Sequence, residues 1–388
     1  MAANMPHNTP IRTDAQETPK GEVRVWDLGL RLFHWLLVAG IATALLTGFF
    51  APEWWLSVHV WAGYGIAGLA LFRIVWGFAG PGPARFANFP VSPRQVLTHI
   101  RHIWGGNSLH FAGHNPLGAL MVFGLIGVIA LILLSGMVGL GGQENLGFLA
   151  GFVPYRQGAA ALELHEVLSF VLLAMIGLHV SGVAAESLLS RSNLVRAMIT
   201  GRKPAHDFAD HEVLAPASMV KGALVLAAAF ALVGLNVWDL SRKPASGFIT
   251  ISTPADYASE CGDCHHAYHP SLLPAASWRG IMAGLEDHFG EDASLEPKAV
   301  REISDWLVAH ASENWDTEAA NNLRRVSAEN PWRITASPYW VRRHQGLDAA
   351  LFKAKAVGSK GNCIACHQDA SLGRFEDRNI NLPTTPNS

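Results

Sequence analysis

Charged residues are scarce in this chain of 388 residues: Asp, Glu, Lys and Arg make up only 15% of it, whereas ordinary soluble domains have about a quarter. The apolar residues gather in five runs, each near the roughly 20 residues that cross a bilayer. Core helices of a soluble protein would be shorter and carry charged faces, but no charge occurs between Leu117 and Leu140. The scarcity of charge therefore predicts membrane spans at residues 31–50, 56–78, 116–140, 162–185 and 220–238.

The N-terminal segment lacks the apolar core that a secretory signal peptide requires. Residues 1–22 are polar and contain prolines, so we expect a disordered tail and no cleavable signal peptide. The chain also lacks an excess of positive charge, because its formal net charge is −2. No nucleic-acid partner is therefore expected.

Cysteine is equally rare, and all four cysteines fall in two Cys-x-x-Cys-His units. These are Cys261-Gly-Asp-Cys264-His265 and Cys363-Ile-Ala-Cys366-His367. The spacing lets both thiols add to one haem while the adjacent histidine reaches the iron, as in c-type haem attachment. For a single copy, a redox dithiol, half of a zinc site or chance would compete. Two copies with no cysteine left over favour two covalently bound haem c groups. Such attachment takes place outside the cytoplasm, so the C-terminal third is predicted to be exported.

The basic residues are distributed unevenly between the loops, which predicts orientation by the positive-inside rule. The N-terminal tail and the loops after the second and fourth runs hold 12 of them, and the two other loops hold one, Arg156. The 12 are Arg12, Lys20, Arg24, Arg31, Arg85, Arg94, Arg101, Arg191, Arg196, Arg202, Lys203 and Lys221. We therefore expect a bacterial inner-membrane protein with a cytoplasmic N-terminus and a periplasmic C-terminal domain. The haem argument reaches the same orientation from different residues.

Four histidines lie within the apolar runs, where histidine is rare and indicates function. They are His34 in the first run, His59 in the second, and His165 and His179 in the fourth. A lone histidine there could equally be an interfacial or packing residue. However, His165 and His179 are about four helical turns apart, so they face nearly the same side with ~21 Å between them. Depth then pairs His179 with His34 and His165 with His59. Two such sites in a helical bundle predict two b-type haems.

A buried arginine supports this interpretation. Arg73 follows His59 by 14 residues and shares its face at the depth of the inner pair. A charge at that depth needs a partner, and a haem propionate is the natural one; the alternative is an arginine that snorkels to the headgroups. Four other histidines are expected on the solvated surface, although one of them, His114, could cap the helix of the third run. They are His99, His102, His110 and His114.

The first half of the chain resembles the bacterial cytochrome b561 family, which is related to the cytochrome b subunits of nickel hydrogenases. The resemblance covers residues 23–202 and includes the His165/His179 pair. The other matching stretches are Val25-Trp26-Asp27, Arg31-Leu-Phe-His34-Trp35, His59-Val-Trp-Ala-Gly63, Arg73-Ile-Val-Trp-Gly77 and Gly113-His114-Asn115-Pro116-Leu-Gly118. It implies a four-helix bundle that holds two b haems and exchanges electrons with quinone. The fifth run is then an added anchor.

Residues 257–383 resemble the periplasmic di-haem cytochrome c family. The matching stretches surround both Cys-x-x-Cys-His units and include Leu272-Leu-Pro274, Ser277-Trp278 and His288-Phe-Gly290. The resemblance implies a second histidine on each iron, at His288 and His344, opposite the proximal His265 and His367. His269 departs from the family pattern, where proline is expected, and stays open as a competing ligand or a surface residue.

Together these features predict an all-α protein: a transmembrane four-helix di-haem b bundle, a fifth anchoring span and a mostly helical di-haem cytochrome c domain. The predicted parts are a cytoplasmic tail (1–22), the membrane domain (23–205), the fifth span with its linker (206–245) and the c domain (246–388).

Irons with two protein ligands leave no open position, which favours electron transfer over oxygen chemistry. We expect a membrane-bound carrier between the quinone pool and a soluble periplasmic cytochrome or other redox protein. Whether it is an enzyme of the quinol:cytochrome c type stays open, as does a homodimer.

One alternative is a superoxide:quinone oxidoreductase, which needs a cationic periplasmic funnel that Arg156 alone would supply. The other is the membrane cytochrome subunit of a larger dehydrogenase or hydrogenase, a partner that the attached c domain makes less necessary.

Overall fold

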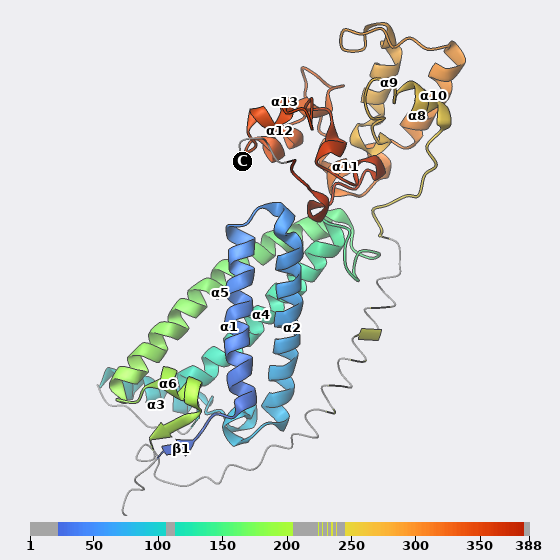
Figure 1. Ribbon diagram of the computed structural model, residues 1–388. Coiled ribbons are helices and arrows are strands. Elements are labelled where there is room, and N and C mark those ends of the chain that lie inside the picture. Colours follow the sequence, from blue (N-terminus) through green and yellow to red (C-terminus); the bar gives the residue numbers. More distant parts are fainter. Residues whose placement is uncertain are drawn as a thin grey trace, which may run out of the picture. The chain divides into compact units, whose positions relative to one another are not determined.

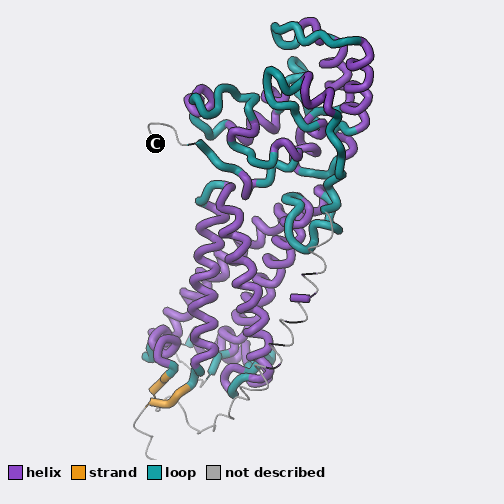
Figure 2. Tube along the Cα trace, turned by 45° about the vertical axis from the view of Figure 1, so that its right-hand side comes forward, coloured by secondary structure: helices purple, strands orange, loops and turns teal. Residues whose placement is uncertain are grey.

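The computed structural model describes residues 22–105, 113–204 and 245–383, together with six isolated positions between 224 and 238. The described chain is all-α, as predicted (Figures 1 and 2). Its strands, within these residues, are β1 (Glu22–Arg24) and β2 (Arg202–Pro204), which form one short antiparallel pair.

Four helices of the described chain are long and apolar enough to cross a membrane. They are α1 (Leu28–Phe49), α2 (Leu56–Ala79), α4 (Pro116–Gly142) and α5 (Tyr155–Leu189). They match the first four predicted spans, except that α5 begins well before residue 162. The predicted fifth span at 220–238 lies outside the described residues, apart from the isolated positions.

Polar side chains fix where two of these helices begin. Asp27 accepts a hydrogen bond from the amide of Leu30 (3.0 Å) and another from the indole of Trp76 (3.2 Å), which joins the start of α1 to α2. Asn115 accepts from the amide of Gly118 (2.7 Å) and so caps α4. The cap is therefore Asn115 and not His114, because an Asn carbonyl reaches the free amides of a first turn directly.

The chain forms two compact units. Unit 1 comprises Met1–Trp35, Phe72–Leu125 and Met175–Leu224; unit 2 comprises Leu36–Leu71, Ile126–Ala174 and Val225–Ser388. Unit 1 also contains α3 (Pro93–Trp104), which begins with a Ser92/Gln95 capping box, and α6 (Leu194–Thr200). In unit 2, α4 and α5 approach backbone to backbone, because a Cβ on Gly158 would lie 2.6 Å from the Cα of Gly142.

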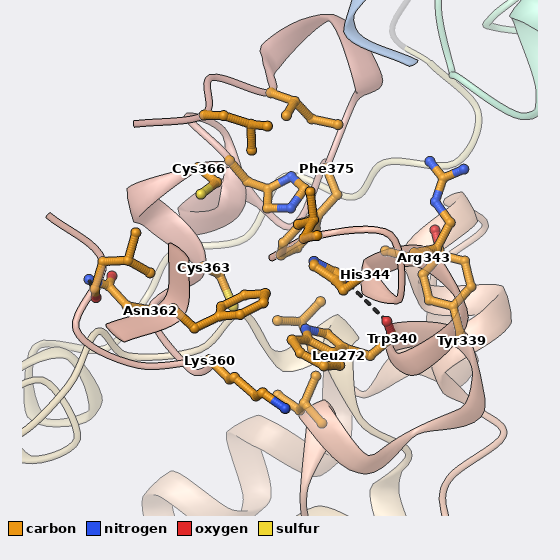
Figure 3. A pocket seen from close by; sticks show the side chains of 18 of the residues that line it. Leu272, Tyr339, Trp340, Arg343, His344, Lys360, Asn362, Cys363, Cys366 and Phe375 are labelled. Carbon is orange, nitrogen blue, oxygen red and sulfur yellow. Dashed lines mark hydrogen bonds between the residues drawn. The ribbon is translucent and has the colours of Figure 1, made fainter. Parts of the chain in front are cut away.

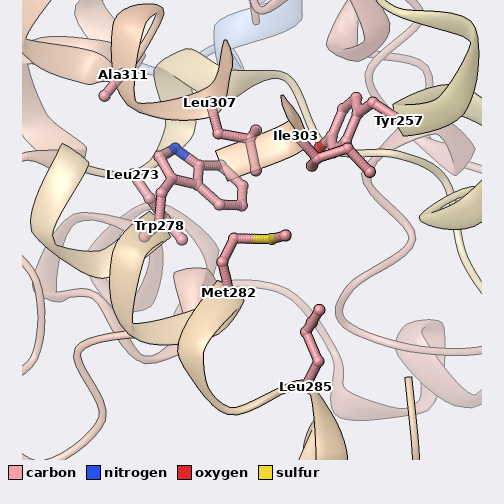
Figure 4. Packing of buried hydrophobic residues seen from close by; sticks show 8 residues of the cluster. All are labelled: Tyr257, Leu273, Trp278, Met282, Leu285, Ile303, Leu307 and Ala311. Carbon is pink, nitrogen blue, oxygen red and sulfur yellow. The ribbon is translucent and has the colours of Figure 1, made fainter. Parts of the chain in front are cut away.

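The C-terminal part of unit 2 is built from short helices around a small core. They are α8 (Ala255–Glu260), α9 (Ala275–Ala283), α10 (Pro297–Ala309), α11 (Glu318–Leu323), α12 (Pro338–His344) and α13 (Ala349–Lys353). Trp278 and Met282 of α9 pack against Ile303 and Leu307 of α10 (Figure 4). The indole of Trp278 donates to the carbonyl of Pro270 (2.8 Å), so this buried polar group is satisfied. This core holds the segment that carries the first Cys-x-x-Cys-His unit.

Candidate functional site

His59 of α2 and His165 of α5 face each other within unit 2. Their ring centroids are 6.0 Å apart and the rings are inclined by 70°. Two imidazole nitrogens that each lie about 2 Å from one shared metal ion place their ring centroids about 6 Å apart. The predicted pair therefore has the separation that a shared iron requires.

The neighbouring helices orient both rings. The Nδ1 atom of His59 lies 3.1 Å from the carbonyl oxygen of Ala44 on α1, and that of His165 lies 2.9 Å from the carbonyl oxygen of Ile132 on α4. A carbonyl only accepts, so each Nδ1 carries the proton and donates. This leaves each Nε2 as a lone-pair donor for a metal.

Glycines make room for these two rings. A Cβ on Gly136 would lie 3.0 Å from the Cε1 atom of His165, and one on Gly48 would lie 3.3 Å from the Cε1 atom of His59. Thr47 and Ser135, one position earlier, place their hydroxyls 3.1 and 3.3 Å from the respective Nδ1 atoms. Sequence reasoning missed these residues. A repeated pattern in the sequence could have indicated them, because Leu45-Leu-Thr-Gly48 and Leu133-Leu-Ser-Gly136 have the same order of residue types.

Unit 1 contains the other predicted pair, His34 of α1 and His179 of α5. Arg73 is only 2% exposed, and its guanidinium lies 4.4 Å from the centroid of the Phe86 ring. The snorkelling alternative is therefore wrong. Among the described residues, neither terminal nitrogen of Arg73 has a hydrogen-bond partner, nor has the Nδ1 atom of His34. Unsatisfied buried donors of this kind fit an anionic group such as a haem propionate.

His114 joins this part of unit 1, although sequence reasoning placed it by default on the surface. Its ring lies 4.9 Å from the Trp26 ring and 4.7 Å from the Phe89 ring. Burial, together with the positive charges of Arg73 and Lys203, lowers the pKa of His114 to about 3. His99 was also expected on the solvated surface, but it is buried, with 1% of its surface exposed. His110 lies outside the described residues.

The first c site consists of Cys261, Cys264, His265 and His288. The rings of His265 and His288 have centroids 6.2 Å apart with 30° between their planes. The Nδ1 atom of His265 donates to the carbonyl of His266 (2.8 Å), which again leaves its Nε2 free. Cys264 and His265 are exposed.

The second c site consists of Cys363, Cys366, His367 and His344. The two histidine rings lie 6.1 Å apart, and the Nδ1 atom of His344 donates to the carbonyl of Trp340 (2.8 Å). Both cysteines line a cavity with these histidines (Figure 3). The cysteines form no disulfide. No cluster of three or more His, Cys, Asp or Glu side chains suited to a metal ion occurs in the described residues, whereas a structural zinc site needs four ligands.

His269 does not approach either c site in this way. It is 8% exposed, accepts a hydrogen bond at Nδ1 from the amide of Ser271 and packs its ring 4.7 Å from Trp315. The structure thus brings His288 and His344, rather than His269, to the ring separation that a shared iron requires. Ligation itself remains a prediction.

Comparisons with known proteins divide the chain in the same way. Residues 25–201 match the family model described as prokaryotic cytochrome b561, and residues 257–375 match the one described as dihaem cytochrome c. The chain is 22% identical to a probable Ni/Fe-hydrogenase B-type cytochrome subunit of Bradyrhizobium diazoefficiens; the match covers 48% of this chain and 87% of that protein. It is 27% identical to the corresponding probable subunit of Azotobacter vinelandii, and that match covers 48% of this chain and 92% of that protein. It is 36% identical to the solved structure of DHC from Rhodobacter sphaeroides, covering 32% of this chain and 98% of that one, with a TM-score of 0.25.

The donor sets agree with these families: paired histidines in the apolar helices, and paired histidines beside two thiols in the C-terminal region. Both families imply haem, of the b and c types respectively. Residues 25–201 therefore belong to the prokaryotic cytochrome b561 family and residues 257–375 to the dihaem cytochrome c family, which makes the chain a membrane electron-transfer protein.

Proposed function

We propose that this protein carries electrons between the quinone pool and a soluble periplasmic redox protein, using two b haems and two c haems. The observation that carries the proposal is the set of three histidine pairs whose ring centroids lie 6.0, 6.2 and 6.1 Å apart. Each pair would supply two nitrogen ligands to one haem iron, which favours electron transfer over oxygen or substrate chemistry. The family resemblance supports quinone as the membrane substrate.

The proposal assigns residues to each of four sites. His59 and His165 hold the outer b haem, and His34 and His179 hold the inner one, with Arg73 facing a propionate. Cys261 and Cys264 attach one c haem between His265 and His288; Cys363 and Cys366 attach the other between His367 and His344. When bound, haem iron supplies reversible one-electron chemistry. The protein would contribute the histidine nitrogens that hold the iron, the hydrogen bonds that orient those rings and an apolar surrounding.

The proposed orientation places the N-terminus in the cytoplasm and the c domain in the periplasm. Its support is the 12-to-1 distribution of basic residues between the two sets of loops. The His59/His165 pair then belongs to the periplasmic half of the membrane domain.

Haem content tests the architecture first. A pyridine haemochrome assay on the purified chain should give equal amounts of acid-extractable and covalent haem. The variants His165→Ala and His59→Ala should lose one b haem, and His34→Ala and His179→Ala should lose the other. If His34→Ala and His59→Ala remove the same haem, the assignment of pairs is wrong.

Rapid mixing with quinol tests the function. Quinol should reduce the b absorbance and then the c absorbance in the reconstituted full chain. In His165→Ala the c absorbance should stay oxidised on the turnover timescale, although a soluble reductant still reduces it directly. Normal c reduction by quinol in this variant would contradict the proposed path.

A second role is favoured by the names of the relatives, which are probable hydrogenase cytochrome subunits. In that role the chain would serve as the membrane cytochrome of a larger dehydrogenase or hydrogenase. Purification from its native membrane without crosslinker separates the two, because a subunit should retain a stoichiometric partner and a self-contained carrier should not.

A further inference from the structure

The cavity of the second c site includes residues of the membrane region. Glu53 and Trp54 line it together with His344 and His367. Both belong to the 3-10 helix η1 (Glu53–Trp55), which connects α1 to α2. All of these residues lie within unit 2. The second c site is therefore completed by the membrane region, while Cys264 and His265 of the first c site are exposed.

An ion-pair network fixes this contact. Arg343 donates to Glu53 (2.6 Å) and to Asp377 (2.7 Å), the latter in the 3-10 helix η11 (Asp377–Asn379). Its side chain is 27% exposed and that of Asp377 is 14% exposed. Arg343 directly precedes His344 on α12, so the pair fixes the position of a proposed iron ligand as well as the contact.

A second group of contacts joins the C-terminal region to the start of α5. The amide of Tyr155 donates to Asp316 Oδ2 (2.9 Å), and the Asn322 side chain donates to the Tyr155 hydroxyl (2.9 Å). The amide of Ser246 donates to the carbonyl of Ala150 (2.8 Å). Two separate connections of the membrane helices are thus bonded to the C-terminal region, which limits rotation about either one.

His59 lies near the connection that lines the cavity of the second c site. His59 is the fourth residue of α2, so it lies about 5 Å along the helix axis from the residue that follows η1. The rate of electron tunnelling falls exponentially with distance. A haem held by His59 and His165 would therefore exchange electrons rapidly with a haem at the second c site, whose cavity η1 lines.

Tyr268 connects the two c sites to each other. Its ring lies 4.9 Å from the His265 ring, and its hydroxyl donates to the carbonyl of Gly361 (2.9 Å), two residues before Cys363. Electrons that arrive at the second c site therefore have a packed route to the first.

We propose that the second c site is the entry point for electrons from the membrane region and that the first c site is the exit toward the soluble redox protein. This order rests on the proposed function and adds to it the separate role of each c site. Arg343 and Glu53 act as positioning residues that hold the second site against the membrane region.

The docking can be tested without any turnover, by hydrogen exchange of the full haem-loaded chain in detergent. In Glu53→Gln, peptides that cover α12 and η11 should exchange about two- to fivefold faster, because a partly exposed ion pair is worth little more than that. Peptides around Cys261 should not change. Glu302→Gln, which breaks the exposed Lys298–Glu302 pair (3.8 Å), is the matched control and should leave α12 unchanged. Unaltered exchange of α12 and η11 in Glu53→Gln would overturn the docking.

The order is tested by marking each c haem with a methionine ligand, His288→Met for the first site and His344→Met for the second. After quinol is added, the band of the second site should change before that of the first; with a soluble protein reductant, the first should change before the second. The reverse order in either arm refutes the proposal. If quinol reduces no haem at all, the proposed function fails; the arm with the soluble protein reductant then still tests whether the first c site is the one that meets a soluble partner.

Discussion

At the scale of single residues, the position of the His59 and His165 rings depends on glycines, which have no side chain, at positions 48 and 136. A methyl group at position 136 would lie 3.0 Å from the Cε1 atom of His165, closer than the 3.5–4.0 Å at which carbon atoms pack well. The ring would have to move, and with it the hydrogen bond to Ile132. We therefore expect Gly136→Ala to lower the b haem content by about half, because one of two proposed sites is disturbed. Pyridine haemochrome analysis measures this loss.

The same helix supplies the control. A Cβ on Gly127 would meet nothing within 4 Å, so Gly127→Ala should keep the full b haem content. Equal haem loss in the two variants would show that helix α4 tolerates no substitution in general, and would remove the special role of Gly136.

Arg73 is a buried cation whose terminal nitrogens have no partner among the described residues. A nearby positive charge favours the reduced form of an iron site, since reduction removes one positive charge. Replacement by glutamine should therefore lower the potential of the inner b haem by on the order of 60 mV, which is tenfold in the one-electron equilibrium. An optical redox titration measures this shift.

Arg73→Lys keeps the charge and should retain most of the potential, while the outer b haem should not respond to either change. A glutamine variant with both b potentials unaltered would mean that Arg73 does not face a haem.

At the scale of elements, the contact between η1, α12 and η11 brings several carboxyls together. Burial raises the pKa of Asp377 from 3.8 to about 6; Arg343 opposes this rise and Glu53 adds to it. Burial also raises the pKa values of Glu144 and Glu318. A raised carboxyl pKa means that the folded state holds its proton more tightly than the unfolded state does.

The stability contributed by Asp377 should therefore be fully present below about pH 4, fall as the pH rises to about 6 and level off above it. The loss for Asp377 is on the order of 3 kcal/mol. Denaturant unfolding of the chain, followed through the c absorbance, should show this fall between about pH 4 and 6. Asp377→Asn should reduce the slope, and an unchanged slope would contradict the assignment.

The elements that could be predicted from the sequence are those whose signal is local. Four apolar runs became α1, α2, α4 and α5 because a span needs only length and low charge, and each Cys-x-x-Cys-His unit is read within five residues. Contacts across elements left no such signal. The Glu53–Arg343 pair joins residues 290 apart, and the burial of His114 depends on Trp26 and Phe89, which reach it from other segments. The approach of His59 to His165 was predictable because helical periodicity converts spacing into depth, whereas His288 and His344 were predicted from the family resemblance.

At the scale of the whole molecule, the two c sites differ in their surroundings. Residues 260–296, which contain the first c site, hold one basic residue, Arg279, and seven carboxylates, all exposed. The seven are Glu260, Asp263, Glu286, Asp287, Glu291, Asp292 and Glu296. The segment that contains the first c site therefore carries a net negative charge, and we expect the proposed soluble partner to present a positive surface to it.

Electron exchange with a positively charged soluble redox protein should consequently depend on salt. Attraction between opposite surfaces speeds the encounter at low ionic strength, and the screening length shortens from about 30 Å at 0.01 M to about 8 Å at 0.15 M. The second-order rate, measured by rapid mixing of the reduced chain with the oxidised partner, should fall by about tenfold over this range.

Glu286→Gln combined with Asp292→Asn should lower the rate at low salt and weaken its dependence on salt, because two negative charges are removed. Neither side chain is part of the haem site. A negatively charged partner is the control and should react faster as salt rises. A rate with the positive partner that is insensitive to salt would mean that the carboxylates around the first c site do not guide docking.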